Sequence, residues 1–375
     1  MTQRPNWHIG RPMEYPYDAA KPARQVAYIF DTNKCIECQT CTVACKSAWT
    51  SGKGQETIFW NNVETKPYGG YPMGWDTKLL EMLGPAKWSG SKLDSQTIFE
   101  RGTAKEPPLG HRPTERDYSA PNLGEDDVSS PIEGGLAFHG THPSWMFYLA
   151  RICNHCDHPA CAAACPRKAI YKRTEDGIVL VDQERCRGYQ ECIRACPYKK
   201  VFYNAINRAS EKCIGCFPRV ENGEVALCVE SCIGKIRMHG FLTTQGEPRA
   251  DNPLDYIVKF RKLALPLYPQ AGTGPNVYYV PPLHVPTGFL EQLFGPGVDA
   301  AKETYRNLAG DPQLLGALLL VGASNRIITR YAVENETAIG WDDEGTELAR
   351  VPFVEPVYVR EKYDAKHEVF RHNLS

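Results

Sequence analysis

The sequence predicts an α+β protein, and two observations carry this prediction. Fifteen cysteines fall into four groups of short spacing, with strand patterns directly before the first group and directly after the last. From Asn252 onward, the composition changes to segments with helical spacing and N-cap signals. The 375 residues are enough for two to three domains, or for one domain with large insertions.

The cysteine spacing is typical of iron–sulfur ligation. The first group is a complete C-x2-C-x2-C-x3-C run, and Pro166 and Pro197 directly follow the last cysteines of the second and third groups. In chain order the groups are Cys35, Cys38, Cys41 and Cys45; Cys153, Cys156, Cys161 and Cys165; Cys186, Cys192 and Cys196; and Cys213, Cys216, Cys228 and Cys232.

A crossing rule assigns these cysteines to clusters. In two-cluster ferredoxins, three closely spaced thiolates hold one cluster and the fourth reaches the other. The reason is geometric, because a C-x2-C-x2-C run wraps around one cluster, whereas the next cysteine enters a helical turn and points away. The rule predicts three 4Fe-4S clusters, held by Cys35, Cys38, Cys41 and Cys232; by Cys45, Cys213, Cys216 and Cys228; and by Cys153, Cys156, Cys161 and Cys196.

The remaining set has only three thiolates, Cys165, Cys186 and Cys192. Tyr189 stands in the middle ligand position of the third group, and a phenol is a poor ligand for cluster iron compared with a thiolate. This set therefore predicts a 3Fe-4S cluster, with Tyr189 packed against it.

The order of the groups predicts two nested ferredoxin-like modules of two clusters each. An outer module, residues 25–47 and 208–245, encloses an inner module, residues 148–207. The other segments are an N-terminal arm (1–24), a loop-rich insertion (48–147) and a C-terminal docking extension of mixed helical and extended structure (246–375). The Pro- and aromatic-rich insertion suits a docking surface for partner subunits or a cover that shields clusters from water.

Local patterns place the individual elements. Val26, Tyr28 and Phe30 alternate as in a strand, and residues 169–173 and 178–182 predict a hairpin around Glu175-Asp176-Gly177. Further elements are a strand with Ile236, Met238 and Gly240, helices that begin at Asn252-Pro253, Thr287 and Asp311-Pro312, and an extended segment from Arg350 to Arg360.

Charge and hydropathy exclude several classes of function. With 43 basic and 44 acidic residues, the net charge of -1 gives no support for binding to nucleic acid. The longest apolar run, Leu314 to Ala323, is about half of the ~20 residues that span a bilayer, so no direct membrane span is expected. The N-terminus has no apolar core, twin arginine or cleavage site, so no signal peptide is expected.

The sequence shows no site for a substrate. It lacks a dinucleotide fingerprint, a Walker loop and a serine elbow, and no catalytic residue is predicted. The basic residues near the cysteines would raise cluster potentials or balance charge; they are Lys34, Lys46, Arg167, Lys168, Arg187, Lys199, Lys200 and Lys212.

A zinc-bound structural scaffold is the alternative of a different class. Paired C-x2-C units also build four-cysteine zinc sites, but these sites do not require a C-x2-C-x2-C-x3-C run. His155 and His158 lie inside the second cysteine group, where the cysteine count is already sufficient. We therefore expect both histidines to be loop residues and not ligands.

The chain resembles the β subunits of molybdenum nitrate reductases and nitrite oxidoreductases. The resemblance rests on the cysteine order, on CRGYQECIRACPYKK with its aromatic Tyr189, on KCIGCFPR, and on the later NPLDYIVKFRKLALPLYP and NVYYVPP. Membrane nitrate reductases typically have tryptophan at the position of Tyr189. Related β subunits serve ethylbenzene and dimethyl sulfide dehydrogenases and selenate and chlorate reductases. In formate dehydrogenase or hydrogenase β subunits the third group is normally complete, so Tyr189 argues against them.

The resemblance implies a non-catalytic electron-transfer subunit that relays electrons between a molybdenum bis-pterin catalytic subunit and a haem b subunit. It implies that the Cys35 cluster faces the catalytic subunit, that the three-iron cluster faces the haem, and that the catalytic reaction is nitrite oxidation or nitrate reduction. It also implies a membrane-associated complex on the exported side, through co-export with the catalytic subunit. A cytoplasmic location is the alternative.

Overall fold

The computed structural model describes residues 2–17, 21–67, 69–102, 108–118, 145–354 and 359–374. The α-helices are α1 (Thr40–Trp49), α2 (Trp75–Leu83), α3 (Ala160–Ala163), α4 (Glu191–Ala195), α5 (Phe217–Val220), α6 (Leu227–Glu230), α7 (Pro253–Asp255), α8 (Thr287–Phe294), α9 (Val298–Arg306) and α10 (Pro312–Ala323). The strands are β1 (Thr2–Asn6), β2 (Arg11–Tyr15), β3 (Arg24–Asp31), β4 (Asn62–Lys66), β5 (Trp88–Ser89), β6 (Lys92–Leu93), β7 (Phe147–Arg151), β8 (Ile170–Lys172), β9 (Val179–Val181), β10 (Val201–Asn204), β11 (Ala209–Lys212), β12 (Arg237–Thr243), β13 (Leu265–Pro266), β14 (Val277–Val280), β15 (Arg330–Glu334), β16 (Thr337–Trp341), β17 (Glu347–Pro352), β18 (Val359–Asp364) and β19 (Val369–Leu374).

Strand β3 lies at the centre of the molecule, in a sheet of order β12-β3-β14-β13. It pairs antiparallel with β12 and parallel with β14, and it is buried from Gln25 to Asp31. Its alternation separates two hydrophobic cores, because Val26, Tyr28 and Phe30 pack into one while Ala27 and Ile29 pack into the other. The strand expected around Val26 and Phe30, and the one expected after Cys232, are both confirmed.

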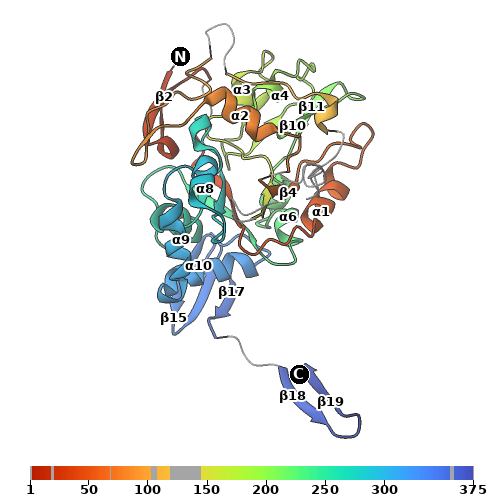
Figure 1. Cartoon of the computed structure of the whole chain (residues 1–375), viewed down its shortest axis with the longest axis vertical. Coiled ribbons are helices and arrows are strands. Elements are labelled where there is room, and N and C mark those ends of the chain that lie inside the picture. Colours follow the sequence, from red (N-terminus) through yellow and green to blue (C-terminus); the bar gives the residue numbers. More distant parts are fainter. Residues whose placement is uncertain are drawn as a thin grey trace, which may run out of the picture.

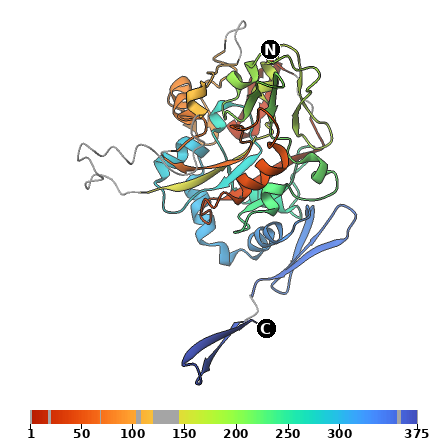
Figure 2. The same ribbon diagram turned by 90° about the vertical axis from the view of Figure 1, so that its right-hand side faces the viewer.

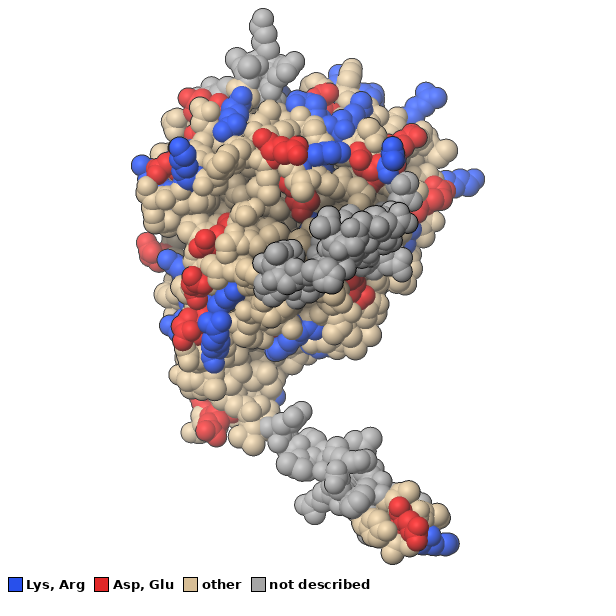
Figure 3. Space-filling view, viewed as in Figure 1, with Lys and Arg blue, Asp and Glu red and all other residues tan. Residues whose placement is uncertain are grey.

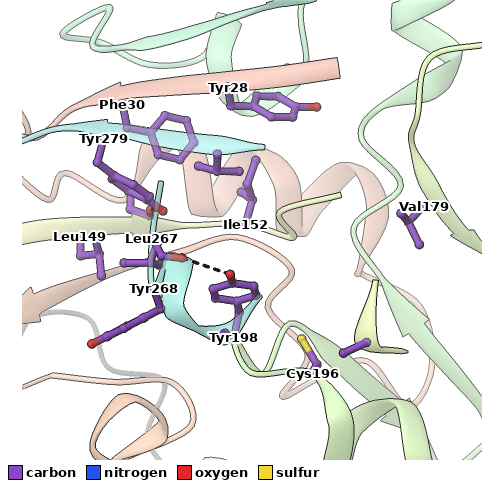
Figure 4. Packing of buried hydrophobic residues seen from close by; sticks show 14 of the residues in the cluster. Tyr28, Phe30, Leu149, Ile152, Val179, Cys196, Tyr198, Leu267, Tyr268 and Tyr279 are labelled. Carbon is purple, nitrogen blue, oxygen red and sulfur yellow. Dashed lines mark hydrogen bonds between the residues drawn. The ribbon is translucent and has the colours of Figure 1, made fainter. Parts of the chain in front are cut away.

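The larger core extends toward the segment of residues 147–212. Figure 4 shows Tyr28, Phe30 and Tyr279 above Leu267, whose carbonyl accepts a hydrogen bond of 3.1 Å from the Tyr198 hydroxyl beside Cys196. In this segment β8 pairs with β9 and β10 pairs with β11. The turn between β8 and β9 requires φ = +71° at Gly177, so the expected hairpin around this glycine is confirmed.

The N-terminal arm and the insertion contain more regular structure than their composition indicates. The arm forms the hairpin β1–β2, whose Ile9, Met13 and Tyr15 are buried in the larger core. In the insertion, β4 pairs with β7, and α2 buries Trp75 and Leu79. The part of the insertion at residues 119–144 lies outside the described residues.

The C-terminal part contains the three helices expected from their caps or spacing. Asn252 accepts a hydrogen bond from the Leu254 N–H at 3.1 Å, and Asp311 accepts one from the Leu314 N–H at 3.0 Å. The first helix continues as a π-helix over Tyr256–Phe260, which its spacing does not indicate. The expected extended segment is confirmed at residues 350–352 and 359–360, while residues 355–358 lie outside the described part.

The elements follow the long axis of the molecule. Helices α3 and α4 lie at one end of the body, and α10 with β15 and β17 lies at the other, while the hairpin β18–β19 stands apart (Figures 1 and 2). On the face shown in Figure 3, basic and acidic side chains are interspersed, in keeping with the balanced charge. Within the described residues, no helix is long and apolar enough to cross a membrane.

Candidate metal centres

Four short helices each carry two cysteines that are separated by one helical turn. Residues four apart in a helix lie on one face, about 6 Å apart along the axis, so each pair can reach two neighbouring sites. In α3, α4 and α6 the second cysteine lies just after the helix. The four pairs are Cys41 and Cys45, Cys161 and Cys165, Cys192 and Cys196, and Cys228 and Cys232.

The second cysteine of α1 faces a cavity with three thiols from the fourth group. This Cys45 cavity is lined by Cys45, Cys213, Cys216 and Cys228. Its other walls are apolar or aromatic, and they include Tyr28, Trp60 and Ile152. The buried Trp60 indole N–H has no hydrogen-bond partner among the described residues, so it is available to an acceptor in the cavity.

A second cavity takes the first cysteine of α3 and the second cysteine of α4. This Cys153 cavity is lined by Cys153, Cys156, Cys161 and Cys196. Tyr198 and Lys200 also line it, and both are almost fully buried. The cavity therefore lies within the larger core and away from water.

A third cavity contains the other cysteine of each of these two helical pairs, Cys165 after α3 and Cys192 in α4. This Cys165 cavity is lined by Cys165, Cys186 and Cys192, together with Tyr189 and Ser210. The Ser210 N–H donates to Cys186 Sγ at 3.3 Å, and the Ser210 hydroxyl lies 3.3 Å from Cys192 Sγ. Tyr189 is 60% exposed, so it covers the outer side of the cavity and is not part of the core.

The last four thiols form the Cys35 set: Cys35, Cys38, Cys41 and Cys232. Burial raises the pKa of Cys35, and the nearby thiols Cys41 and Cys232 add to the rise. Cys38 is exposed, whereas Cys41 and Cys232 are buried. This set therefore lies at the molecular surface, one turn of α1 from the Cys45 cavity.

Several of the buried cysteines have raised pKa values, so their thiolate forms need a bound metal group to stabilise them. Burial raises the pKa of Cys192 and Cys216 to about 11. It also raises the pKa of Cys213 to about 12, so an empty site would hold neutral thiols at pH 7. Burial also lowers the pKa of Lys199 to about 7 and that of Lys200 well below its ordinary value, while the nearby thiols Cys196 and Cys45 act to raise these two pKa values. Metal binding requires thiolates, and their negative charge would favour the protonated form of both buried lysines.

The geometry fits clusters better than single ions. Within the described residues, no group of three His, Cys, Asp or Glu side chains is arranged to hold one metal ion. The thiols instead surround three cavities, and the unpartnered Trp60 N–H suits an anionic sulfur acceptor. The residues therefore fit iron–sulfur clusters.

The two histidines near the cysteines have other surroundings. His155 is buried, and its Nδ1 accepts a hydrogen bond of 3.0 Å from the Val179 N–H. His158 lines a separate cavity of about 650 Å³ between the N-terminal hairpin and the C-terminal part, and no cysteine lines that cavity.

Sequence reasoning missed three polar residues around the sites. Arg237 is buried beside the Cys35 set and the Cys45 cavity, Glu64 lies at the centre of a buried ion network, and Ser210 contacts two thiols. The sequence offers one indication of Arg237, because it is an arginine at the start of a predicted strand whose other residues are mostly apolar. Neither Glu64 nor Ser210 belongs to a motif.

Three cysteine-lined cavities and one surface set, connected through paired cysteines on short helices, define an iron–sulfur protein with several clusters. Residues 144–242 match the family model of the 4Fe-4S dicluster domain. The chain is 44% identical to chlorate reductase subunit beta of Ideonella dechloratans over 83% of this chain and 99% of that protein. The chain belongs to the family of iron–sulfur β subunits of molybdenum oxidoreductases, as the electron-transfer subunit and not the catalytic one.

Two further relatives show how broad this family is. Selenate reductase subunit beta of Thauera selenatis is 44% identical over 75% of this chain and 90% of its own length. Respiratory nitrate reductase subunit beta of Haloferax mediterranei is 42% identical over 78% of this chain and 90% of its own length.

Proposed function

We propose that this chain carries three 4Fe-4S clusters and one 3Fe-4S cluster in two nested modules, and relays electrons between a molybdenum catalytic subunit and a haem b subunit. Bound clusters would supply one-electron redox chemistry. The observation that carries the proposal is the separation of each helical cysteine pair, because Cys161 and Cys196 line one cavity while Cys165 and Cys192 line another.

The ligand sets of the proposal are those of the crossing rule. The three 4Fe-4S clusters take the Cys35 set, the four cysteines of the Cys45 cavity and the four of the Cys153 cavity, and the 3Fe-4S cluster takes the three of the Cys165 cavity. Buried aromatic side chains exclude water from two of the sites, Trp60 at the Cys45 cavity and Tyr198 at the Cys153 cavity. The buried Lys200 also lines the Cys153 cavity.

Exposed apolar side chains at both ends support the two docking sites of the relay. Ile36, Val43 and Ile233 are exposed around the Cys35 set, and we assign this surface to the catalytic subunit. Tyr189 and Tyr171, the neighbour of the cavity-lining Ile170, are exposed around the Cys165 cavity, and we assign this surface to the haem b subunit. Such surfaces on a charged protein are typical of subunit interfaces.

We infer the partner's substrate and the location of the complex from the relatives. We propose that the complex oxidises nitrite or reduces nitrate, as the name of the Haloferax relative suggests, with chlorate, selenate or dimethyl sulfide as alternatives suggested by other relatives' names. We further propose that the complex lies at a membrane, on the exported side.

The experiment that tests the ligand sets uses the two cysteines of α1 in the purified complex. Cys45→Ala should alter the electron paramagnetic resonance (EPR) signal of one cluster, and Cys41→Ala should alter a different one, although the two cysteines lie only one turn apart on α1. Ser47→Ala, at an exposed position of α1, should change neither signal and serves as the control.

Two outcomes would count against the proposal. If both cysteine variants alter the same signal, the crossing is wrong. If the wild-type protein is colourless and contains zinc in place of iron, the chain is a zinc scaffold.

A further inference from the structure

Arg237 is a buried cation whose counter-charge is not a carboxylate. Its side chain is 1% exposed at the start of β12, and its guanidinium lies 4.5 Å from the centre of the Phe30 ring on β3. No ion pair found among the described residues includes Arg237. By contrast Arg151, which is equally buried, forms an ion pair with Glu64. Because buried charges are costly unless they are paired, Arg237 requires an anion nearby.

The groups around Arg237 are the thiols of two predicted clusters. Burial acts to lower its pKa, but Cys41, Cys228, Cys232 and Cys35 raise it above the ordinary value. Cys228 lines the Cys45 cavity, whereas the other three belong to the Cys35 set. Arg237 starts β12 five residues after Cys232, and its charge acts on thiols of both ligand sets.

The guanidinium is oriented by one hydrogen bond and has a second nitrogen available. Its Nη2 donates to Asn61 Oδ1 at 3.1 Å. Its Nη1 has no hydrogen-bond partner within the described part of the chain. An arginine remains protonated at all relevant pH values, so the charge between the two sets is fixed.

We propose that Arg237 is a positioning residue shared by the two clusters of the outer module, those of the Cys35 set and the Cys45 cavity. The single positive charge of Arg237 raises the midpoint potentials of both of these outer clusters. The physical reason is that reduction adds an electron to an anionic cluster, and a fixed cation nearby stabilises the reduced state more than the oxidised state. The inference rests on the proposed ligand sets.

The test is an EPR-monitored redox titration of the purified complex. For each outer cluster, the comparison is made at the potential where that cluster is half reduced in wild type. There, Arg237→Gln should lower the ratio of reduced to oxidised cluster about tenfold, which corresponds to a midpoint potential lower by about 59 mV. The signals of the Cys153 and Cys165 sites should keep their midpoints. Arg237→Lys retains the charge without the planar fork and should shift both midpoints less.

The matched control is Arg219, which lies near Cys216 but pairs with Glu224 at 3.2 Å and with Glu230. Because the Arg219 side chain is 26% exposed, water screens its charge, so Arg219→Gln should shift both midpoints much less than Arg237→Gln does. Asn61→Asp provides a second variant that leaves Arg237 in place. A carboxylate at the position of Asn61 Oδ1 offsets the guanidinium charge, so both outer midpoints should fall.

The outcomes separate this inference from the proposed function. If Arg237→Gln retains both outer clusters and their midpoints do not move, or only one moves, the inference is wrong. If Arg237→Gln fails to assemble its clusters, Asn61→Asp decides, and unchanged midpoints in that variant reject the inference. Wild-type protein without two distinct outer signals would instead reject the proposed ligand sets.

Discussion

Tyr189 occupies the position where the third cysteine group lacks a thiolate, and it lies on the outer side of the Cys165 cavity. Its exposure places the phenol where both water and a partner can reach it. A cysteine at this position would complete the set with Cys165, Cys186 and Cys192.

Replacement of Tyr189 by Cys is expected to convert the proposed three-iron cluster into a 4Fe-4S cluster of lower potential. The oxidised wild-type complex should show a three-iron EPR signal, and Tyr189→Cys should lose it. Tyr171→Cys, an exposed tyrosine that does not line the cavity, should retain the signal. A wild-type complex without this signal and with iron for four complete clusters would contradict the assignment.

At the level of residues, the sequence allows the cysteines to be grouped into ligand sets, because cluster ligation imposes a fixed spacing on nearby positions. It could not predict Arg237 or Glu64, because their partners are distant in the sequence. Arg237 contacts Asn61, and Glu64 contacts Arg151, across separations of 176 and 87 residues. Only the folded backbone brings these pairs together.

At the level of elements, a buried polar network joins the insertion to the segment of residues 147–212. Glu64 on β4 accepts hydrogen bonds from the Tyr71 N–H at 2.9 Å and from the Trp75 indole at 3.1 Å, and it pairs with Arg151 on the neighbouring β7. Burial acts to raise the pKa of Glu64, but the charges of Arg151 and Lys66 hold it well below the ordinary range. The carboxylate is therefore ionised throughout the physiological pH range.

Glu64→Gln is expected to destabilise the protein by about 3–5 kcal/mol, because it leaves Arg151 buried without its counter-charge. Urea unfolding followed by tryptophan fluorescence measures this loss, and Glu14→Gln at an exposed position should change the stability by less than about 0.5 kcal/mol. A loss below about 1 kcal/mol for Glu64→Gln would show that the network contributes little.

The pH dependence follows from the same pair. Because the folded-state pKa of Glu64 lies below its unfolded value of 4.5, its contribution is present above that value and is lost as the pH falls through the folded pKa. Between neutral pH and strong acid, Glu64→Gln should therefore lose less stability than wild type does.

The prediction of elements was best where a local signal sets the boundary. Helices α8 and α10 begin at the expected Thr287 and Asp311-Pro312 signals. The β1–β2 hairpin was not expected, because each of its strands contains a proline, Pro5 or Pro12, and neither strand shows a clear alternation. Its buried residues include Ile9 and Met13, which pack in the larger core. Tertiary contact, not local propensity, stabilises this hairpin.

At the level of the whole molecule, the two exposed apolar surfaces lie beside different cysteine sets, so they should bind different partners. Ile233→Glu beside the Cys35 set is expected to weaken co-purification with the catalytic subunit and to retain the haem b subunit. Tyr171→Glu, on β8 next to Ile170 of the Cys165 cavity, should have the opposite effect. Equal loss of both partners from either variant would contradict the assignment of the two ends.

Strand β3 also has a consequence for biosynthesis. Its partners β12 and β14 begin at Arg237 and Val277, so the ribosome must add about 200 residues after Asp31 before this apolar strand can pair. At roughly 5–20 residues per second, this interval lasts on the order of 10–40 s. Throughout it, the thiols that follow β3 remain without Cys232, exposed to oxidants and to premature metals. The sheet at the centre of the molecule and the Cys35 set are therefore both completed late in synthesis, by the same part of the chain.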